Sequence, residues 1–260
     1  MKLFDLFRRK RKNTYESIKN PQNIVLNGNS SFEFAESLRS LKVTLSVALP
    51  KREDGKGVSI MCVSSYSKEG KTTIAINLAV SLSSSSPSRK IVVLDADLRK
   101  GNASYRLIGD PVPGLTDYLS GSATFEEILR PVEGYENLYV IPRGSLTVRP
   151  YDLLSSNAMK DLLDNLNSQF AYTIIDTAPM RMVSDALAIA PFVAGSVLVC
   201  RHKDSYEGDI KKAVAKLHYF KANVLGLIIN DYVEKKNSKL QQALPYYTYI
   251  AQAQEQQKHE

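Results

Sequence analysis

The residues with the clearest chemistry lie in a loop that joins an apolar run to a helical pattern. The run VSIMCV covers residues 58–63, the loop reads SSYSKEGKTT, and a helical pattern follows. In such a loop backbone N–H groups surround phosphates, a lysine reaches the β and γ oxygens, and a neighbouring hydroxyl binds Mg²⁺. Lys71 and Thr72 fit these roles, although Ser65 replaces the usual first glycine and a structural turn is the alternative. The candidate ATP-binding residues of the loop are Ser67, Lys68, Glu69, Gly70, Lys71, Thr72 and Thr73.

Three carboxylates at the ends of apolar runs extend this candidate site. Asp95 and Asp97 follow the run IVVL, and Asp176 follows YTII. Open parallel sheets bind ligands at the carboxyl edge of their strands, and residues two apart on an extended chain point the same way. Both aspartates of the pair could therefore face one Mg²⁺–nucleotide, and the alternative is that they cap the next helix. Asp176 fits the metal-holding strand end of phosphate-loop proteins. The candidate metal ligands are Thr72, Asp95, Asp97 and Asp176.

The elements that must position these residues alternate along the chain. Apolar runs at 58–63, 90–95, 138–141, 172–176, 196–200 and 224–230 predict strands, and the segments between several of them have helical spacing, as in KTTIAINLAVSL, DLLSSNAMKDLLDNL and YEGDIKKAVAKLHYF. A further helix is predicted before the first strand, with one apolar face made of Phe34, Leu38, Leu41, Leu45 and Leu49. The fold class is therefore α/β, a doubly wound, mostly parallel sheet flanked by helices. At the exposed edge of this sheet, removal of Lys71 or Asp95 should cost little stability.

Composition divides the 260 residues into three regions and limits the partners. Residues 1–31 are a basic arm and linker, residues 32–233 the phosphate-loop domain, and residues 234–260 a polar tail. Residues 1–12 carry six basic side chains against one acid, so most of the net charge of +7 lies there. A loose arm argues against nucleic acid as a partner. The arm either lies on an anionic membrane surface or is solvated.

The location follows from what the sequence lacks. The best apolar window, 182–200, contains Asp185 and Pro191, so no membrane-spanning helix is expected, and the arm does not have the order of a secretory signal. Cys62 and Cys200 lie in apolar runs and are expected to be reduced core thiols. We expect a cytoplasmic protein that lies peripherally at the inner face of the cell membrane without entering the bilayer.

The motifs SYSKEGKTT, IVVLDADLR and YTIIDTAP resemble the Walker A, Walker A-prime and Walker B motifs of the bacterial tyrosine kinases that control capsule and exopolysaccharide export. The resemblance runs from about residue 33 to residue 249 and includes the split form of the family, whose activator is a separate membrane protein of the polysaccharide co-polymerase type. It implies an ATP- and Mg²⁺-dependent tyrosine autokinase. The implied catalytic residues are Lys71, Asp95, Asp97 and Arg99, with Asp95 or Asp97 accepting the tyrosine proton, and Asn230 matches a family asparagine near the nucleotide base or else caps a strand.

The same resemblance implies assembly and acceptor sites. The family's ring-building motif ExxRxxR is matched by Glu36, Arg39 and Lys42, and its tyrosine-rich tail by Tyr246, Tyr247 and Tyr249. Three tyrosines near a terminus can also be incidental, and charges on a helix face can simply be solvated. The chain departs from the family where Ser67 and Lys68 replace the Pro-Gly or Pro-Asn that commonly precede the acidic loop residue.

Two other classes remain open from the sequence. A switch ATPase of the partitioning or division-site type dimerises on DNA or membrane, but it has a signature lysine where this chain has Tyr66. An inactive nucleotide-binding scaffold for the export machinery is the other class, because the unusual loop residues could slow turnover.

Overall fold

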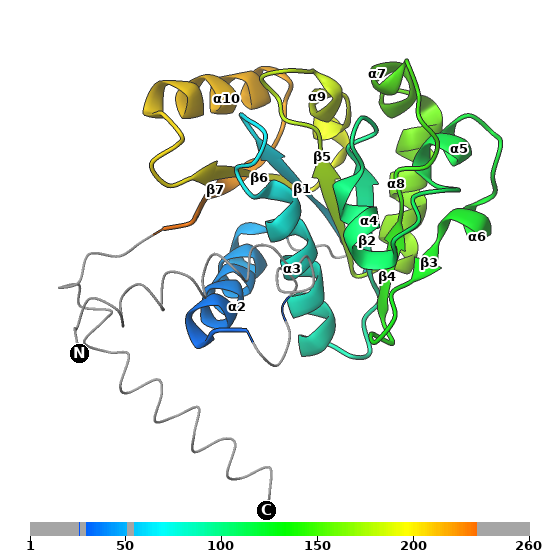
Figure 1. Ribbon diagram of the computed structural model, residues 1–260, viewed down its shortest axis with the longest axis horizontal. Helices are drawn as coiled ribbons and strands as arrows, with labels where there is room; N and C mark the ends of the chain where they lie inside the picture. Colours follow the sequence, from blue (N-terminus) through cyan, green and yellow to red (C-terminus); the bar gives the residue numbers. More distant parts are fainter. Residues whose placement is uncertain (1–25, 27–29, 51–54, 233–260) are drawn as a thin grey trace, which may run out of the picture. The chain divides into compact units, whose positions relative to one another are not determined.

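A computed structural model describes residues 26, 30–50 and 55–232 of the chain. Contacts divide the chain after Asn230 into two units, and of the second unit only Asp231 and Tyr232 are described. The three tail tyrosines Tyr246, Tyr247 and Tyr249 and nearly all of the basic arm lie outside the described residues. All the described helices and strands belong to the first unit (Figure 1).

The first unit is built on a seven-stranded sheet with the order β3-β4-β2-β5-β1-β6-β7. All neighbouring strands are parallel except β3 and β4, which are antiparallel. The six predicted strands are all present, as β1 (Val58–Ser64), β2 (Ile91–Ala96), β4 (Leu138–Ile141), β5 (Tyr172–Thr177), β6 (Gly195–Arg201) and β7 (Val224–Asn230). The two-residue edge strand β3 (Arg130–Pro131) was not predicted, since two residues carry no periodicity.

Helices cover both faces of the sheet, which confirms the doubly wound α/β class. One core cluster joins one face to α5 (Leu115–Leu119), α6 (Phe125–Ile128), α7 (Pro150–Leu154), α8 (Asn157–Gln169), α9 (Asp185–Ile189) and α10 (Glu207–Tyr219). The other joins the opposite face to α2 (Phe32–Ala48), α3 (Lys71–Ser85) and α4 (Asn102–Ile108). A 3₁₀ turn, η2 (Ala190–Phe192), follows α9. On α2 and just after it, Leu38, Leu45 and Leu49 are buried, as the apolar spacing predicted.

The helical pattern DLLSSNAMKDLLDNL proves to be two helices rather than one. The structure interrupts it at Ser155 and Ser156, between α7 and α8. The Ser156 hydroxyl accepts a hydrogen bond from the backbone N–H of Met159 at 3.3 Å and so caps α8. A serine at the start of a helix offers this side-chain bond in place of the missing backbone partner, which is why the pair breaks the pattern.

The two cysteines and the possible membrane-spanning helices were also considered from the sequence. Cys62 and Cys200 are free and buried, and burial raises the pKa of their thiols to about 12 and about 11. Among the described residues, no helix is long and apolar enough to cross a bilayer.

Asn137, just before β4, connects the sheet to the end of α3 and the turn after it. Its amide nitrogen donates to the carbonyl oxygens of Ser83, Ser86 and Arg89 at 3.2, 2.9 and 2.7 Å, and its amide oxygen accepts from the Ser83 hydroxyl. The residue is 9% exposed. The carbonyls of Ser83 and Ser86 also accept from the backbone N–H groups of Ser86 and Arg89 at 3.3 and 2.9 Å. Asn137 therefore adds side-chain bonds that tie the end of α3 and the turn after it to the sheet.

We predict that Asn137→Ala lowers the free energy of unfolding by about 1–3 kcal/mol, because the hydrogen bonds of its side chain to the end of α3 and the following turn are lost. Asn165→Ala is the matched control, since the Asn165 side chain bonds the exposed Gln169 on the same helix, α8, and alanine favours a helix. Urea unfolding followed by circular dichroism measures both. An Asn137→Ala protein as stable as the control would show that the Asn137 bonds do not hold this end of the unit.

Candidate phosphate-binding site

The loop after β1 has the backbone shape that a phosphate site needs. Gly70 begins α3 in the left-handed region with φ of 98°, and a β-carbon there would lie 1.9 Å from the amide nitrogen of Asn230. Only glycine fits this position. Lys68 also has a positive φ, 68°, and its side chain is exposed, as is that of Ser67. The loop thus ends on the N-terminus of a 15-residue helix, where N–H groups attract anions.

Buried polar contacts hold the loop from within. Glu69 is buried and accepts from the backbone N–H of Tyr66 at 2.8 Å and from the Ser205 hydroxyl. The Asn230 amide donates to the Glu69 carbonyl at 3.1 Å. Both side-chain oxygens of Glu69 are therefore engaged, one within the loop and one with the chain after β6, which leaves its backbone N–H as the group to meet a phosphate. Asn230 packs on the loop from the end of β7, which favours a supporting role over the simple strand cap.

Lys71 and Asp176 form an ion pair at the end of the central strands. Lys71 is 6% exposed and Asp176 is fully buried at the end of β5. The prediction that Lys71 and Asp95 lie exposed is wrong, because Lys71 turns inward to pair with Asp176 and Asp95 belongs to the fully buried strand β2. A low cost for removing either residue is therefore no longer expected. Loss of one partner of a buried pair leaves an uncompensated charge, which is strongly destabilising.

Asp95 and Asp176 occupy paired positions on the adjacent strands β2 and β5. Both are fully buried, and one oxygen of each, Oδ1 of Asp95 and Oδ2 of Asp176, has no hydrogen-bond partner. Burial, and then the charge of Asp176, raises the pKa of Asp95 to about 7. Buried polar atoms are normally satisfied, so two orphaned carboxylate oxygens side by side mark a place for a cation or a proton.

The remaining oxygens of Asp95 and Asp97 hold the chain that follows β2. Oδ2 of Asp95 accepts from the N–H and the hydroxyl of Ser104 at 2.8 and 2.7 Å. Asp97 lies past the end of β2 and accepts from the N–H of Lys100 at 3.1 Å. Burial raises the pKa of Asp97, and the charge of Lys71 opposes that shift. The alternative that these aspartates cap the following chain is therefore correct for one oxygen of each carboxylate. The second oxygen of each is not used in these bonds.

These residues fit Mg²⁺ as part of a nucleotide complex. Among the described residues, no three His, Cys, Asp or Glu side chains are arranged to hold a metal ion by themselves. Mg²⁺ takes oxygen ligands and is often held by one or two carboxylates, with waters and substrate phosphates completing its shell. The orphaned oxygens of Asp95 and Asp176 match that donor set, and the half-buried Thr72 follows Lys71, the ion-pair partner of Asp176, in the first turn of α3.

Arg99 forms contacts that the sequence did not predict. Its guanidinium makes two hydrogen bonds to the buried carboxylate of Asp185 on α9, at 2.7 and 3.2 Å. Arg99 thereby ties the turn after β2 to the segment after β5. In the sequence, Asp185 stands out only as a break in an apolar window, and a charge inside such a window was the available signal for a buried ion pair.

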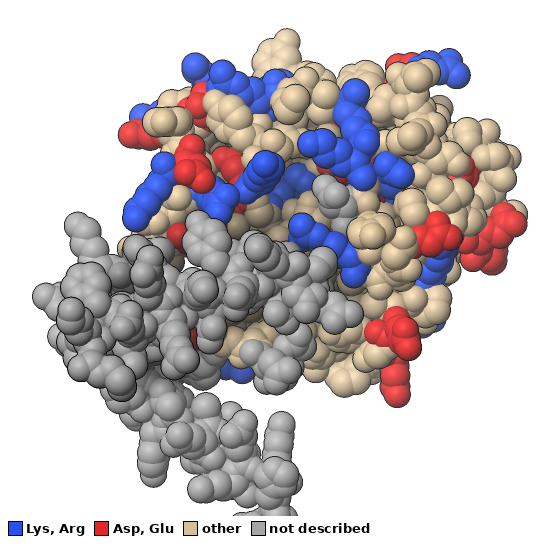
Figure 2. All heavy atoms as spheres, in the orientation of Figure 1, with Lys and Arg blue, Asp and Glu red and all other residues tan. Residues whose placement is uncertain are grey.

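Three other residues of the site were not predicted from the sequence; two of them bond partners 33 and 136 residues away, while Ser104 bonds a partner nine residues before it. Arg106 of α4 donates to the Thr73 hydroxyl at 3.1 Å, while Ser104 donates to Asp95 and Ser205 to Glu69. Figure 2 shows Lys and Arg side chains gathered between α10 and α4 on the face viewed. A field of this sign favours polyanions such as nucleotide phosphates.

The charges expected to join subunits have partners inside this chain. Arg39 pairs with Glu36 one turn away on α2. Lys42 donates to the Ser81 carbonyl at 3.0 Å and to the Ser85 hydroxyl, so it ties α2 to α3. Pairing with a neighbouring subunit would have to replace these contacts.

The raised pKa of Asp95 predicts how stability changes with pH. The folded chain binds the proton more tightly than the unfolded chain, whose pKa is near 3.9, so the free energy of unfolding should fall as pH rises from about 4 to about 7. Asp95→Asn keeps an acceptor for Ser104 without the charge. We expect it to be more stable than the unsubstituted chain at pH 8, by on the order of 1–3 kcal/mol, with a smaller gain near pH 5.

Chemical unfolding at pH 5 and pH 8 measures this, with Asp161→Asn on the exposed face of α8 as the control. A gain for Asp95→Asn that is the same at both pH values would contradict a raised pKa at Asp95.

Comparison with known proteins agrees with this geometry. The profile of the AAA domain matches residues 63–223. The tyrosine-protein kinase ptk of Acinetobacter johnsonii is 32% identical over 197 residues, which are 75% of this chain and 26% of that protein. The chain thus spans about a quarter of the length of the curated relatives it matches.

Solved structures give the same assignment. The kinase domain of the Escherichia coli tyrosine kinase ETK is 27% identical with a TM-score of 0.70, over 78% of this chain and 79% of that one. The cell division ATPase MinD of Pyrococcus furiosus is also 27% identical, with a TM-score of 0.57 over 69% and 74%. With its phosphate loop, strand-end acids and doubly wound sheet, the chain belongs to the AAA-domain proteins and, among them, to the bacterial tyrosine kinase family.

Proposed function

We propose that this chain is an ATP-dependent protein tyrosine kinase that phosphorylates tyrosines of neighbouring copies and regulates capsule or exopolysaccharide export. The observation that carries the proposal is the buried group formed by Lys71, Asp176 and Asp95 beside the phosphate loop. It offers a cation for phosphate oxygens, a carboxylate for a metal and a carboxylate that titrates near neutrality. Relatives named as tyrosine-protein kinases support the same activity.

Phosphoryl transfer depends on positioning and charge compensation. When bound, Mg·ATP would supply the γ-phosphoryl group, and its Mg²⁺ would offset part of the negative charge of the phosphate oxygens. Lys71 would leave Asp176 for the β and γ oxygens, while Thr72 and Asp176 hold the metal, directly or through water. The loop N–H groups and the exposed Ser67 and Lys68 would enclose the phosphates, and Arg106 would orient the Thr73 hydroxyl.

The acceptor tyrosine must lose its proton as its oxygen bonds to phosphorus and the bond to the leaving ADP breaks. A phenol has a pKa near 10, so a carboxylate that takes up protons near neutral pH is a suitable acceptor. Asp95 combines a pKa of about 7 with an unpartnered oxygen, which favours it over Asp97 as the base. Arg99 would act as a positioning residue, since its guanidinium holds Asp185.

The acceptors in this proposal are Tyr246, Tyr247 and Tyr249, reached between subunits of a ring. Glu36, Arg39 and Lys42 of α2 would contact a neighbour, and a transmembrane protein of the polysaccharide co-polymerase type would supply the activating segment. The basic arm would place the chain at the inner face of the cell membrane, where each basic side chain adds about 1 kcal/mol on anionic lipid.

A switch ATPase is the second candidate, favoured by the likeness to MinD. That class places a lysine where this chain has Tyr66, and the Tyr66 hydroxyl is bonded to Asp209 at 2.8 Å. An anti-phosphotyrosine blot of the purified chain with Mg·ATP separates the classes, because a switch ATPase hydrolyses ATP without forming phosphotyrosine.

We predict that Thr72→Ala reduces phosphotyrosine formation at least a hundredfold, because the loop loses a metal ligand. Lys71→Ala would be a weaker test, since it leaves Asp176 buried and unpaired. Ser84→Ala removes the same group at the far end of α3 and should keep full activity. Phosphate incorporation and thermal unfolding are measured together. Near-normal activity of a folded Thr72→Ala protein would remove the assignment of Thr72 to the metal.

For the acceptor sites, we predict that replacing Tyr246, Tyr247 and Tyr249 with phenylalanine removes most of the phosphotyrosine signal while assembly in light scattering is unchanged. Phenylalanine keeps the aromatic surface and loses only the acceptor hydroxyl. Mass spectrometry locates the phosphate. Modification mainly at Tyr15, Tyr118 or Tyr135 would overturn the tail assignment and leave the kinase assignment in place.

A further inference from the structure

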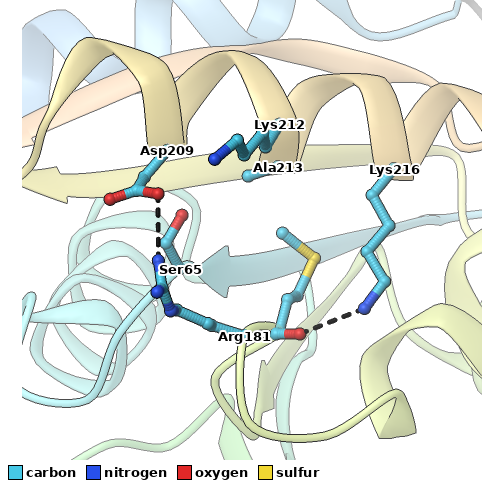
Figure 3. A pocket seen from close by; sticks show the side chains of 7 residues that line it. Ser65, Arg181, Asp209, Lys212, Ala213 and Lys216 are labelled. Carbon is cyan, nitrogen blue, oxygen red and sulfur yellow. Dashed lines mark hydrogen bonds and ion pairs between the residues drawn. The ribbon is translucent and has the colours of Figure 1, made fainter.

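A cavity of about 300 Å³ lies on the α10 side of the phosphate loop, apart from Lys71 and Thr72. Its walls come from three segments: the first residue of the loop, the chain just after β5, and α10. The lining residues are Ser65, Met180, Arg181, Asp209, Lys212, Ala213 and Lys216. Figure 3 shows Asp209, Lys212 and Lys216 projecting from α10 toward the side that carries Ser65 and Arg181.

The charge in this cavity is unbalanced toward positive. Arg181, Lys212 and Lys216 face a single acid, Asp209. That acid is already engaged, because one oxygen pairs with Arg181 at 2.9 Å and the other accepts from the Tyr66 hydroxyl at 2.8 Å. Lys216 donates to the Met180 carbonyl at 3.2 Å, which fixes its ammonium at the wall without neutralising it. A ligand that carries about two negative charges would balance the cavity.

The remaining lining adds a polar floor and an apolar wall. Ser65 is 6% exposed, and its hydroxyl has no hydrogen-bond partner. Buried hydroxyls are normally bonded, so this one is available to a ligand that reaches the floor. Met180 and Ala213 present apolar atoms beside the cations. The volume is at the small end for ligand sites, which suits a compact molecule and excludes a folded partner segment.

We propose that this cavity is a second anion site, separate from the ATP phosphates, that binds a phosphate monoester with its organic group against Met180 and Ala213. A phosphate monoester carries about −1.5 to −2 charge near pH 7 and three acceptor oxygens, which matches the excess charge and the donors of Arg181, Lys212 and Lys216. The organic group could belong to a phosphotyrosine side chain or to a free sugar phosphate, which share this chemistry.

Binding of a ligand in this cavity would change contacts of the phosphate loop. The N–H groups of Met180 and Arg181 donate to the carbonyls of Ser64 and Ser65 at 2.9 and 3.1 Å. The Arg181 guanidinium also lies 4.8 Å from the ring centre of Tyr66. A phosphate that draws Arg181 away from Asp209 therefore changes the contacts of Tyr66 inside the loop, which couples the two sites.

Calorimetric titration of the full chain with O-phospho-L-tyrosine, glucose 6-phosphate and inorganic phosphate tests the proposal. We expect at least one monoester to bind more tightly than inorganic phosphate, and still to bind in the presence of excess Mg·ADP. Lys212→Gln should weaken that binding at least fivefold. Lys211→Gln is the matched control, because Lys211 is next to Lys212 on α10 but pairs with Glu207 outside the cavity, and it should change affinity less than twofold.

Each other result decides against the site. Absence of monoester binding would overturn the proposal, and so would equal binding of inorganic phosphate. Displacement of the monoester by Mg·ADP would contradict a site separate from the ATP phosphates, and unchanged affinity of Lys212→Gln would contradict this cavity. None of these readouts depends on kinase activity, so the proposal and the proposed function can fail separately. Tighter binding of phosphotyrosine than of glucose 6-phosphate supports a protein side chain as the source, and the reverse order supports a free sugar phosphate.

Discussion

The buried contact between Lys71 and Asp176, with Asp95 next to it, is the constraint on which the structure of the site depends. Taking an ammonium and two carboxylates out of water is costly, and their attraction offsets that cost only when the geometry is good. The sheet supplies the geometry, since β1, β2 and β5 are neighbours and end at the same edge. All three side chains are buried. One ammonium beside two carboxylates leaves an excess negative charge, which a proton on Asp95 or a metal ion can neutralise.

The phosphate loop departs from the family pattern at Ser67 and Lys68. The family commonly has Pro-Gly or Pro-Asn where this chain has Ser67 and Lys68. Lys68 adopts the left-handed backbone that a glycine enters freely, and such a conformation in a lysine costs on the order of 1 kcal/mol. The buried Glu69 accepts one hydrogen bond from the N–H of Tyr66 within the loop and one from the Ser205 hydroxyl, which joins the loop to the chain after β6. The loop of this chain is thus held by side-chain contacts of Glu69 and Asn230.

Most of the fold was predictable from sequence because the strands are apolar on both faces and the helices have clear spacing. The six strands, the buried face of α2 and the helix after the loop all follow from local pattern. The ends of β1, β2 and β5 also place the loop and the three acids at one edge. What sequence could not give were contacts between distant segments, such as Arg99 with Asp185 or Asn137 with the end of α3. These contacts depend on which strands become neighbours in the sheet, and local sequence patterns do not predict that order.

The burial of the chemical groups affects how this protein behaves in a living cell. Lys71, Asp95 and Asp176 occupy core positions, with exposures of 6%, 0% and 0%. A change at any of them alters the population of unfolded chain as well as the chemistry, and cells remove unfolded chains by proteolysis. Loss of a phenotype after such a change therefore mixes lower abundance with lower turnover. Genetic screens of this protein can be interpreted only when the amount of each variant is measured alongside its effect.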